Sequence, residues 1–192
     1  LRSDNKYDTT SEKLFERIEK ELISPKEKME LLKHYVYSVI IQHEDMHTKN
    51  LSLIYDKDLV FFAPLYDVSC TGIYDTSKGY DSHLTINGKQ SNIRPNDFKP
   101  LCKILKIDFK EFKEEAFKIA KLYEIELPSY IEEIKALGSI PFYKKKQKPR
   151  IGEGAYLKVS KIPIEFHELL SKFHKERVEH LKALGWIINE SL

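Results

Sequence analysis

Eight consecutive residues near position 45 combine most of the side chains in this sequence that could do chemistry. They are His43-Glu44-Asp45-Met46-His47-Thr48-Lys49-Asn50. An apolar-faced helical segment precedes them, and a strand-like segment over residues 51–55 follows at once. Functional side chains concentrate on loops that rigid elements hold in place, so this stretch is the predicted active-site loop.

Zinc hydrolysis is one chemistry that these residues could support, because His43-Glu44-x-x-His47 fits the H-E-x-x-H pattern. Residues four apart share a helix face, so both imidazoles could bind one zinc ion while Glu44 acts as general base. A third protein ligand would be required, and Asp67 and Glu111 are acidic candidates that nothing in the sequence marks. The simplest alternative is that the histidines only pack and hydrogen-bond at a helix end.

Phosphoryl transfer is the competing chemistry. Asp45 and Asn50 are five residues apart, which is the spacing of the base and the metal-binding amide in a kinase catalytic loop. Such a site needs a second acidic metal ligand after a short hairpin. Residues 51–63 predict that hairpin, with a turn at 56–58, and Asp67 follows it. The hairpin would fold Asn50 and Asp67 back together, so the downstream sequence favours phosphoryl transfer.

These motifs resemble those of the HipA family of bacterial serine/threonine kinases. That family carries Asp-x-His-x-Lys-Asn-(apolar)-Ser, a hairpin, and then Pro-x-Tyr-Asp. Here the first motif covers residues 45–52, and Leu65-Tyr66-Asp67-Val68 matches most of the second. Weaker similarities occur at residues 5–7 and 84–89, so the resemblance covers about residues 5–137.

The resemblance implies a role for each residue of the loop. Asp45 would be the catalytic base, while Asn50 and Asp67 would hold Mg²⁺. Lys49 would contact the γ-phosphate of ATP or balance the charge of Asp45, and His47 would orient the loop beside the nucleotide. The family also implies a toxin–antitoxin system, a DNA-binding antitoxin partner and an aminoacyl-tRNA synthetase as the protein substrate.

The hydrophobic pattern predicts a mainly α-helical chain with short β-hairpins, which suits the helical large lobe of a protein-kinase-like fold. Six helices are expected to begin near Glu12, Pro25, Asn96, Phe109, Pro128 and Pro163. Residues 139–163 contain a basic run at 144–150 and are expected to form an exposed loop before the last helix. The whole chain, residues 1–192, is expected to be a single lobe.

Composition excludes several classes of protein. Charged residues make up 32% of the chain and hydrophobic residues 41%, which indicates a globular, cytoplasmic protein without a membrane span. The formal net charge of +2 argues against direct nucleic-acid binding. Cys70 and Cys102 form no CxxC pattern and are expected to be reduced, inert thiols.

A kinase needs features that this sequence lacks. No glycine-rich loop follows a strand, and no strand lysine can be matched to a helix glutamate. We therefore expect the small lobe to lie on another chain or on an upstream segment, and this chain alone to be inactive. A pseudokinase or regulatory binding lobe, with the same fold and ligands but no transfer, is a third alternative.

Overall fold

The computed structural model describes residues 9–22, 24–57, 59–74, 76–146 and 160–188. Its α-helices are α1 (Ser11–Ile18), α2 (Pro25–Ile40), α3 (Lys99–Leu105), α4 (Phe109–Ala136) and α5 (Phe166–Leu184). Its strands are β1 (Leu53–Asp56), β2 (Leu59–Phe62), β3 (Pro141–Lys146) and β4 (Ser160–Glu165). Short 3-10 turns are η2 (Thr48–Asn50), η3 (Thr71–Ile73) and η4 (Pro95–Phe98). The expectation of a mainly helical chain with short hairpins is confirmed.

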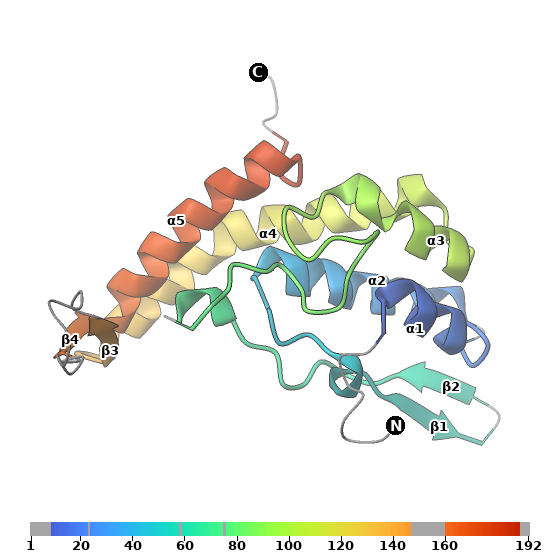
Figure 1. Cartoon of the computed structure of the whole chain (residues 1–192), viewed down its shortest axis with the longest axis horizontal. Coiled ribbons are helices and arrows are strands. Elements are labelled where there is room, and N and C mark those ends of the chain that lie inside the picture. The colour runs from blue at the N-terminus through green and yellow to red at the C-terminus, as the bar shows by residue number, and fades with distance from the viewer. Residues whose placement is uncertain (1–8, 23, 58, 75, 147–159, 189–192) are drawn as a thin grey trace, which may run out of the picture.

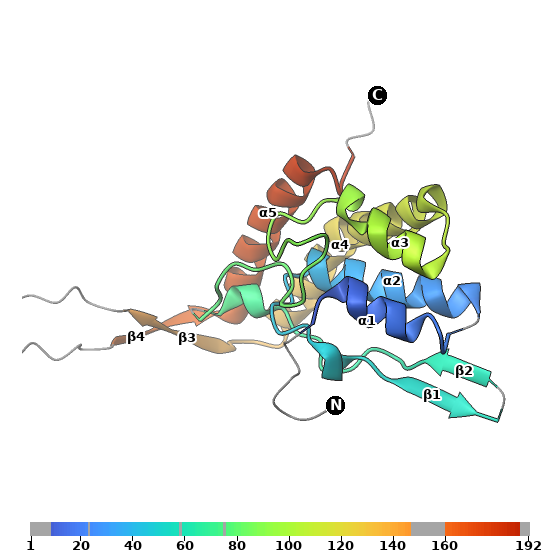
Figure 2. The same ribbon diagram turned by 45° about the vertical axis from the view of Figure 1, so that its right-hand side comes forward.

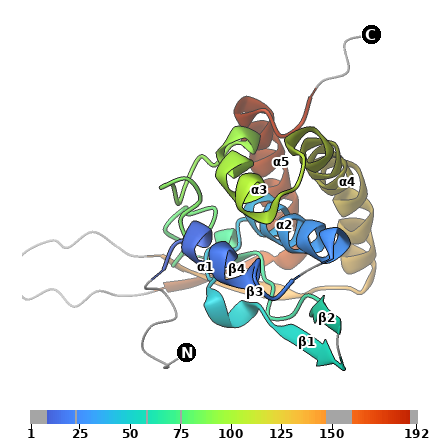
Figure 3. The same ribbon diagram turned by 90° about the vertical axis from the view of Figure 1, so that its right-hand side faces the viewer.

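Helix α2 lies at the centre of the helical body, between α3 and α4 (Figures 1 and 3). Ser24 is its N-cap and Pro25 its first residue, as the sequence predicted. Apolar side chains on most of its circumference are fully buried, among them Leu31, Leu32 and Val39. A helix that is apolar on most sides is buried on most sides, so α2 is a rigid support for the loop that follows it.

Strands β1 and β2 form the first antiparallel hairpin, in which Leu53 pairs with Phe62 and Asp56 with Leu59. The ladder continues beyond the strands, because Ala63 N–H donates to the Ser52 carbonyl at 2.9 Å. This hairpin returns the chain to the point where it left the loop. The predicted hairpin over 51–63 is therefore confirmed.

The second hairpin corrects the prediction for residues 139–163, because β3 and β4 pair in register from Pro141–Glu165 to Lys146–Ser160. Figure 2 shows this hairpin projecting away from the helices. Both ends of the expected loop therefore form strands. The middle of the segment, 147–159, lies outside the described residues, so the expectation of an exposed loop remains a prediction there.

Two of the predicted helix starts, at Pro128 and Pro163, are wrong. Pro128 lies inside α4, which runs unbroken through it and stays packed through the buried Ile131. The second proline, Pro163, lies in β4, and α5 begins three residues later after its N-cap, Glu165. Proline favours the first turn of a helix, but packing along α4 and strand pairing along β4 decided the outcome at these positions.

No helix in the described ranges is both long enough and apolar enough to cross a bilayer.

The core contains a histidine that should make stability depend on pH. His34 of α2 is 3% exposed, neither ring nitrogen has a hydrogen-bond partner, and its ring meets that of Phe62 edge-on. Burial lowers the pKa of His34 to about 4. Between the usual pKa of 6.5 and this value the unfolded chain binds a proton that the folded chain does not. The free energy of unfolding is therefore fully retained above the unfolded pKa of 6.5. As the pH decreases toward the folded pKa, it decreases by up to about 3 kcal/mol.

His34→Leu is expected to remove that acid sensitivity. Leucine fills similar space without buried polar atoms, so the variant should match or exceed the wild type near neutral pH and exceed it more at about pH 5. Urea unfolding at both pH values measures this difference. His167→Leu, at a half-buried position on α5, is the control for removing a histidine. An equal loss of stability on acidification in wild type and His34→Leu would contradict the prediction.

Candidate functional site

The loop singled out by the sequence begins where α2 ends, at Ile40. Gln42 has a φ of 57°, a left-handed conformation that turns the chain away from the helix axis. His43 and His47 consequently lie beyond α2 rather than one turn apart on its face. In the part of the chain that the structure describes, no group of three or more His, Cys, Asp or Glu side chains could hold a metal ion. The zinc-hydrolase alternative is contradicted by this arrangement.

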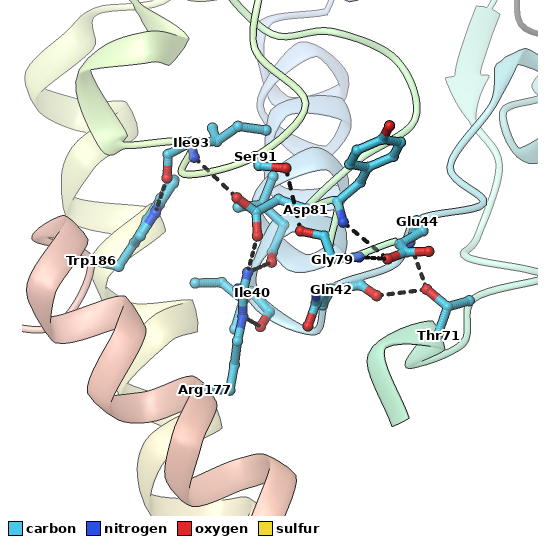
Figure 4. A network of polar contacts seen from close by, with 12 residues as sticks. Ile40, Gln42, Glu44, Thr71, Gly79, Asp81, Ser91, Ile93, Arg177 and Trp186 are labelled. Atoms are coloured by element: carbon cyan, nitrogen blue, oxygen red, sulfur yellow. Dashed lines mark hydrogen bonds and ion pairs between the residues drawn. The ribbon is translucent and has the colours of Figure 1, made fainter. Parts of the chain in front are cut away.

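Glu44, the proposed base of the zinc site, instead holds a neighbouring loop. Its carboxylate accepts hydrogen bonds from the Ser77 hydroxyl at 2.5 Å and from the N–H groups of Lys78, Gly79 and Tyr80 at 3.0, 2.6 and 2.9 Å. Figure 4 shows the contact with Gly79. Burial acts to raise the pKa of Glu44, but these donors outweigh it and the pKa lies below its usual range. A carboxylate bound by four donors is a structural anchor and not a free base.

The Glu44 backbone is held as well. Its N–H donates to the Thr71 hydroxyl at 2.7 Å, and that hydroxyl donates to the Gln42 carbonyl at 2.8 Å. Figure 4 shows these contacts beside the Glu44 carboxylate. Residues 42–44 are therefore fixed to the segments around positions 71 and 77–80, which fixes the chain directly before Asp45.

Glu44→Gln is expected to destabilise the protein by about 2 kcal/mol at neutral pH, because an amide accepts these hydrogen bonds more weakly than a carboxylate does. Since the folded pKa of Glu44 is lowered, its contribution is present above the unfolded value of 4.5 and is lost as pH falls through the folded pKa. Urea unfolding should thus show a difference between variant and wild type that shrinks in acid. Glu132→Gln, at the exposed Lys135 pair on α4, should change little. A constant difference at every pH would contradict this account.

Asn50 and Asp67, the predicted metal ligands, are in contact. The Asn50 Nδ2 atom donates to Asp67 Oδ2 at 3.1 Å, and Asn50 Oδ1 accepts the His47 N–H at 2.8 Å. Residues 48–50 form the 3-10 turn η2. Asp67 adopts a left-handed φ of 53°, which aspartate tolerates better than most residues. The hairpin between the two residues brings them together as the sequence indicated.

Tyr66 and Ser52 form hydrogen bonds beside the Asn50–Asp67 contact. The Tyr66 hydroxyl donates to the Lys49 carbonyl at 2.6 Å and lies 2.7 Å from the Ser52 hydroxyl. The two residues belong to the motifs quoted above, but the sequence assigned them no role. Their spacing in the motifs was the available signal, and the structure shows that they fix the ends of the hairpin to each other.

Asp45 lies at the exposed end of the same loop. The buried His43 ring feels the charge of both Asp45 and Asp67. Burial is the main influence on the pKa of His43 and lowers it, while the two carboxylates act to raise it. Both carboxylates therefore lie near one histidine. Lys49 is also exposed, and His47 is buried.

Asp45 borders a cavity of about 360 Å³. Its walls carry hydroxyl groups and aromatic rings, including Thr71, Tyr74, Ser77 and Tyr80. The loop that Glu44 anchors forms one wall, so the anchor also shapes the space in front of Asp45. An exposed carboxylate at the edge of a polar cavity could orient a hydroxyl-bearing acceptor.

The oxygen donors at Asn50 and Asp67 suit Mg²⁺. This ion prefers hard oxygen ligands and is commonly held by one or two protein side chains together with phosphate oxygens and water. Asp67 supplies a carboxylate, and Asn50 Oδ1, which accepts one hydrogen bond from the His47 N–H, keeps a second lone pair for the ion, while Asn50 Nδ2 donates to Asp67. The chemistry of the donor set therefore fits the expected ion.

The cysteines are not part of the site. Both are free, and burial raises the pKa of Cys70 to about 11 and that of Cys102 to about 12. Both thiols are protonated at neutral pH, which agrees with the expectation of inert side chains.

Comparison with known families identifies the chain. The model of the HipA-like C-terminal domain matches residues 1–137, which is well over half of the sequence. The chain belongs to this family. The resemblance drawn from the loop and hairpin motifs of the HipA-like domain is thereby confirmed, and no curated protein matches the chain.

A solved structure shares the fold of this HipA-like chain. It is the complex of HipA, HipB and operator DNA from the toxin–antitoxin system of Shewanella oneidensis MR-1. The similarity has a TM-score of 0.63 at 13% sequence identity and covers 97% of this chain. It covers 39% of the other chain, so the HipA-like chain spans less than half the length of that protein.

Proposed function

We propose that this chain is the large lobe of a protein-kinase-like enzyme that transfers the γ-phosphoryl group of ATP to a serine or threonine of a protein. The observation that carries the proposal is the 3.1 Å contact between Asn50 and Asp67, beside a loop that presents Asp45 to a polar cavity. A base, an amide and a second carboxylate in this order are the recurring parts of a kinase site.

Each side chain has a role that follows from its charge and position. Asp45 orients the acceptor hydroxyl and takes its proton as the oxygen attacks phosphorus. Asn50 and Asp67 would hold Mg²⁺ through their side-chain oxygens, and the ion would supply positive charge to the phosphate groups. Lys49, exposed between these residues, contacts the γ-phosphate or balances the charge of Asp45.

His47 acts on the loop rather than on the reacting atoms. The backbone N–H of His47 donates to Asn50 Oδ1, and its backbone carbonyl accepts the Asn50 backbone N–H at 3.0 Å. These two bonds orient the Asn50 side chain toward Asp67, which supports a role for His47 as a supporting residue of the nucleotide site. The tight turn η2 is the local structure that makes this possible.

The partners of the protein are also proposals. The Shewanella oneidensis HipA structure contains HipB and operator DNA, which supports a DNA-binding antitoxin as partner of this protein. The family resemblance supports a toxin role, an aminoacyl-tRNA synthetase as substrate and a cytoplasmic location. ATP binding would require a small lobe in addition to this lobe, so we expect the chain alone to transfer no phosphate.

Transfer from γ-labelled ATP tests the proposal. The natural full-length protein, combined with its small lobe where that lobe lies on another chain, should incorporate label into serine or threonine of a protein substrate, and chelation of Mg²⁺ should stop it. Binding of Mg-ATP without any transfer would instead favour a pseudokinase, which the intact Asn50–Asp67 pair would also allow. Absence of both binding and transfer would overturn the proposal.

A further inference from the structure

Arg177 of α5 reaches into the interior and bonds to the end of α2. Its Nε donates to the Ile40 carbonyl at 3.0 Å, and its Nη2 donates to the Val39 carbonyl (Figure 4). The same Nη2 lies 2.7 Å from Asp81 Oδ1. The side chains of Arg177 and Asp81 are 5% and 2% exposed, so this is a buried ion pair.

These contacts give hydrogen-bond donors to carbonyl groups at the C-terminal end of α2. The last carbonyl groups of an α-helix have no partner within the helix, and they carry partial negative charge. The Arg177 guanidinium supplies donors and positive charge at that point, and Asp81 balances the charge. A lysine could not replace it fully, because only the planar guanidinium presents several donors in fixed directions.

Asp81 extends the anchor to a second segment. Its Oδ2 accepts the Ile93 N–H at 3.0 Å, and the Ile93 carbonyl accepts the Trp186 indole N–H at 2.7 Å. Asp81 also follows directly on Tyr80, whose N–H binds the Glu44 carboxylate. The chain around Asp81 is thus bonded to Arg177 on one side and to the active-site loop on the other.

The active-site loop has little freedom between these two anchors. It begins at His43, three residues after Ile40, and passes Glu44 before it reaches Asp45. Phe173 of α5 and Gln42 both pack closely on Gly72, since a Cβ added there would come within 2.6 Å of a Phe173 ring carbon and 2.4 Å of Gln42 Oε1. The position of Asp45 therefore depends on where α5 holds the end of α2.

We propose that Arg177 is a positioning residue for the phosphoryl-transfer site, which sets the place of the loop bearing Asp45 by bonding to the end of α2 and to Asp81. The proposal rests on the proposed function for its catalytic consequence. Helix α5 lies beyond residues 1–137 that match the family, so the proposal assigns a site role to a part of the chain outside that match.

The test must separate positioning from stability. Arg177→Met alone leaves the Asp81 charge buried without its partner, which would destabilise the fold whatever the role of Arg177. Arg177→Met combined with Asp81→Asn removes both charges and keeps a side-chain oxygen for the Ile93 N–H. We therefore expect the double variant to recover most of the unfolding midpoint that the single variant loses.

Catalysis should not recover with stability. In the natural full-length protein, the double variant is expected to show a kcat lower by roughly 10- to 100-fold, the size of effect that a small misplacement of a catalytic group produces. Its KM for Mg-ATP should be unchanged, because the Asn50–Asp67 contact does not involve Arg177. A double variant with both the stability and the kcat of the wild type would show that Arg177 does not position the site.

Hydrogen exchange provides a readout that does not depend on activity. Amides of residues 42–47 should exchange faster in the double variant, while those of α4 should not. Arg177→Lys keeps the charge and should show a smaller change in both kcat and exchange. If the wild type transfers no phosphate, the kinase proposal fails, yet faster exchange would still support the anchor. Unchanged exchange over 42–47 in folded Arg177→Lys and in the double variant would overturn it.

Discussion

Asp45→Asn is expected to lower the rate of phosphoryl transfer by roughly 1,000-fold, within the range that a positioned general base contributes. The amide is almost the same size as the carboxylate but cannot take the proton of the acceptor hydroxyl. Since Asp45 is exposed at the edge of a polar cavity and asparagine has almost the same shape, we expect the fold to be retained. Mg-ATP affinity should also stay unchanged, because Asn50 and Asp67 provide the metal ligands.

The measurement is the single-turnover transfer rate of the natural full-length protein, together with its dissociation constant for Mg-ATP. Asp56→Asn is the matched control, because Asp56 is an exposed aspartate of β1 outside the proposed site. The control should transfer phosphate at the wild-type rate. An Asp45→Asn variant that also keeps most of this rate would show that Asp45 is not the base.

Asp67→Asn is expected to reduce transfer by roughly 100- to 1,000-fold and to raise the Mg²⁺ concentration needed for half-maximal activity. Loss of the carboxylate removes a negative ligand, and metal ions supply several kcal/mol of charge stabilisation in such reactions. The remaining contact to Asn50 joins two neutral amides, which hold a divalent cation poorly. This change in Mg²⁺ requirement distinguishes Asp67 from Asp45, whose replacement should leave it unaltered.

A titration of transfer against Mg²⁺ in both variants tests the distinction. The Asp56→Asn protein should again follow the wild-type curve. If Asp67→Asn lowered the rate at every Mg²⁺ concentration without moving the midpoint, Asp67 would act on the reaction by another route. If Asp45→Asn moved the midpoint instead, the two assignments would be exchanged.

The parts of the site that the sequence predicted well depend on local patterns. Asn50 and Asp67 lie at the two ends of one short hairpin, so the turn signal between them was enough to bring them together. The start of α2 at Pro25 followed from a preference that acts within a single helical turn. Such features can be predicted from neighbouring residues alone, because distant parts of the fold do not determine them.

The parts that could not be predicted depend on contacts between distant segments. Nothing near Glu44 indicates that its carboxylate binds residues 77–80, which lie 33 to 36 positions away. The short H-E-x-x-H pattern indicates a zinc base instead. Arg177 bonds to carbonyls more than 130 positions earlier, and an arginine on a helix has no signature for such a contact. Pro128 was misread for the same reason, because packing overrode its preference for a helix start.

The measurement that tests the central claim most directly is the location of a bound metal–nucleotide. Mn²⁺-ATP added to the isotopically labelled full-length protein broadens the NMR signals of nearby nuclei. We expect the strongest broadening at residues 48–50 and 66–68, which surround the Asn50–Asp67 contact, and its loss in Asp67→Asn. Broadening centred elsewhere, or none at concentrations that support transfer, would contradict the assignment of this loop and hairpin as the phosphoryl-transfer site.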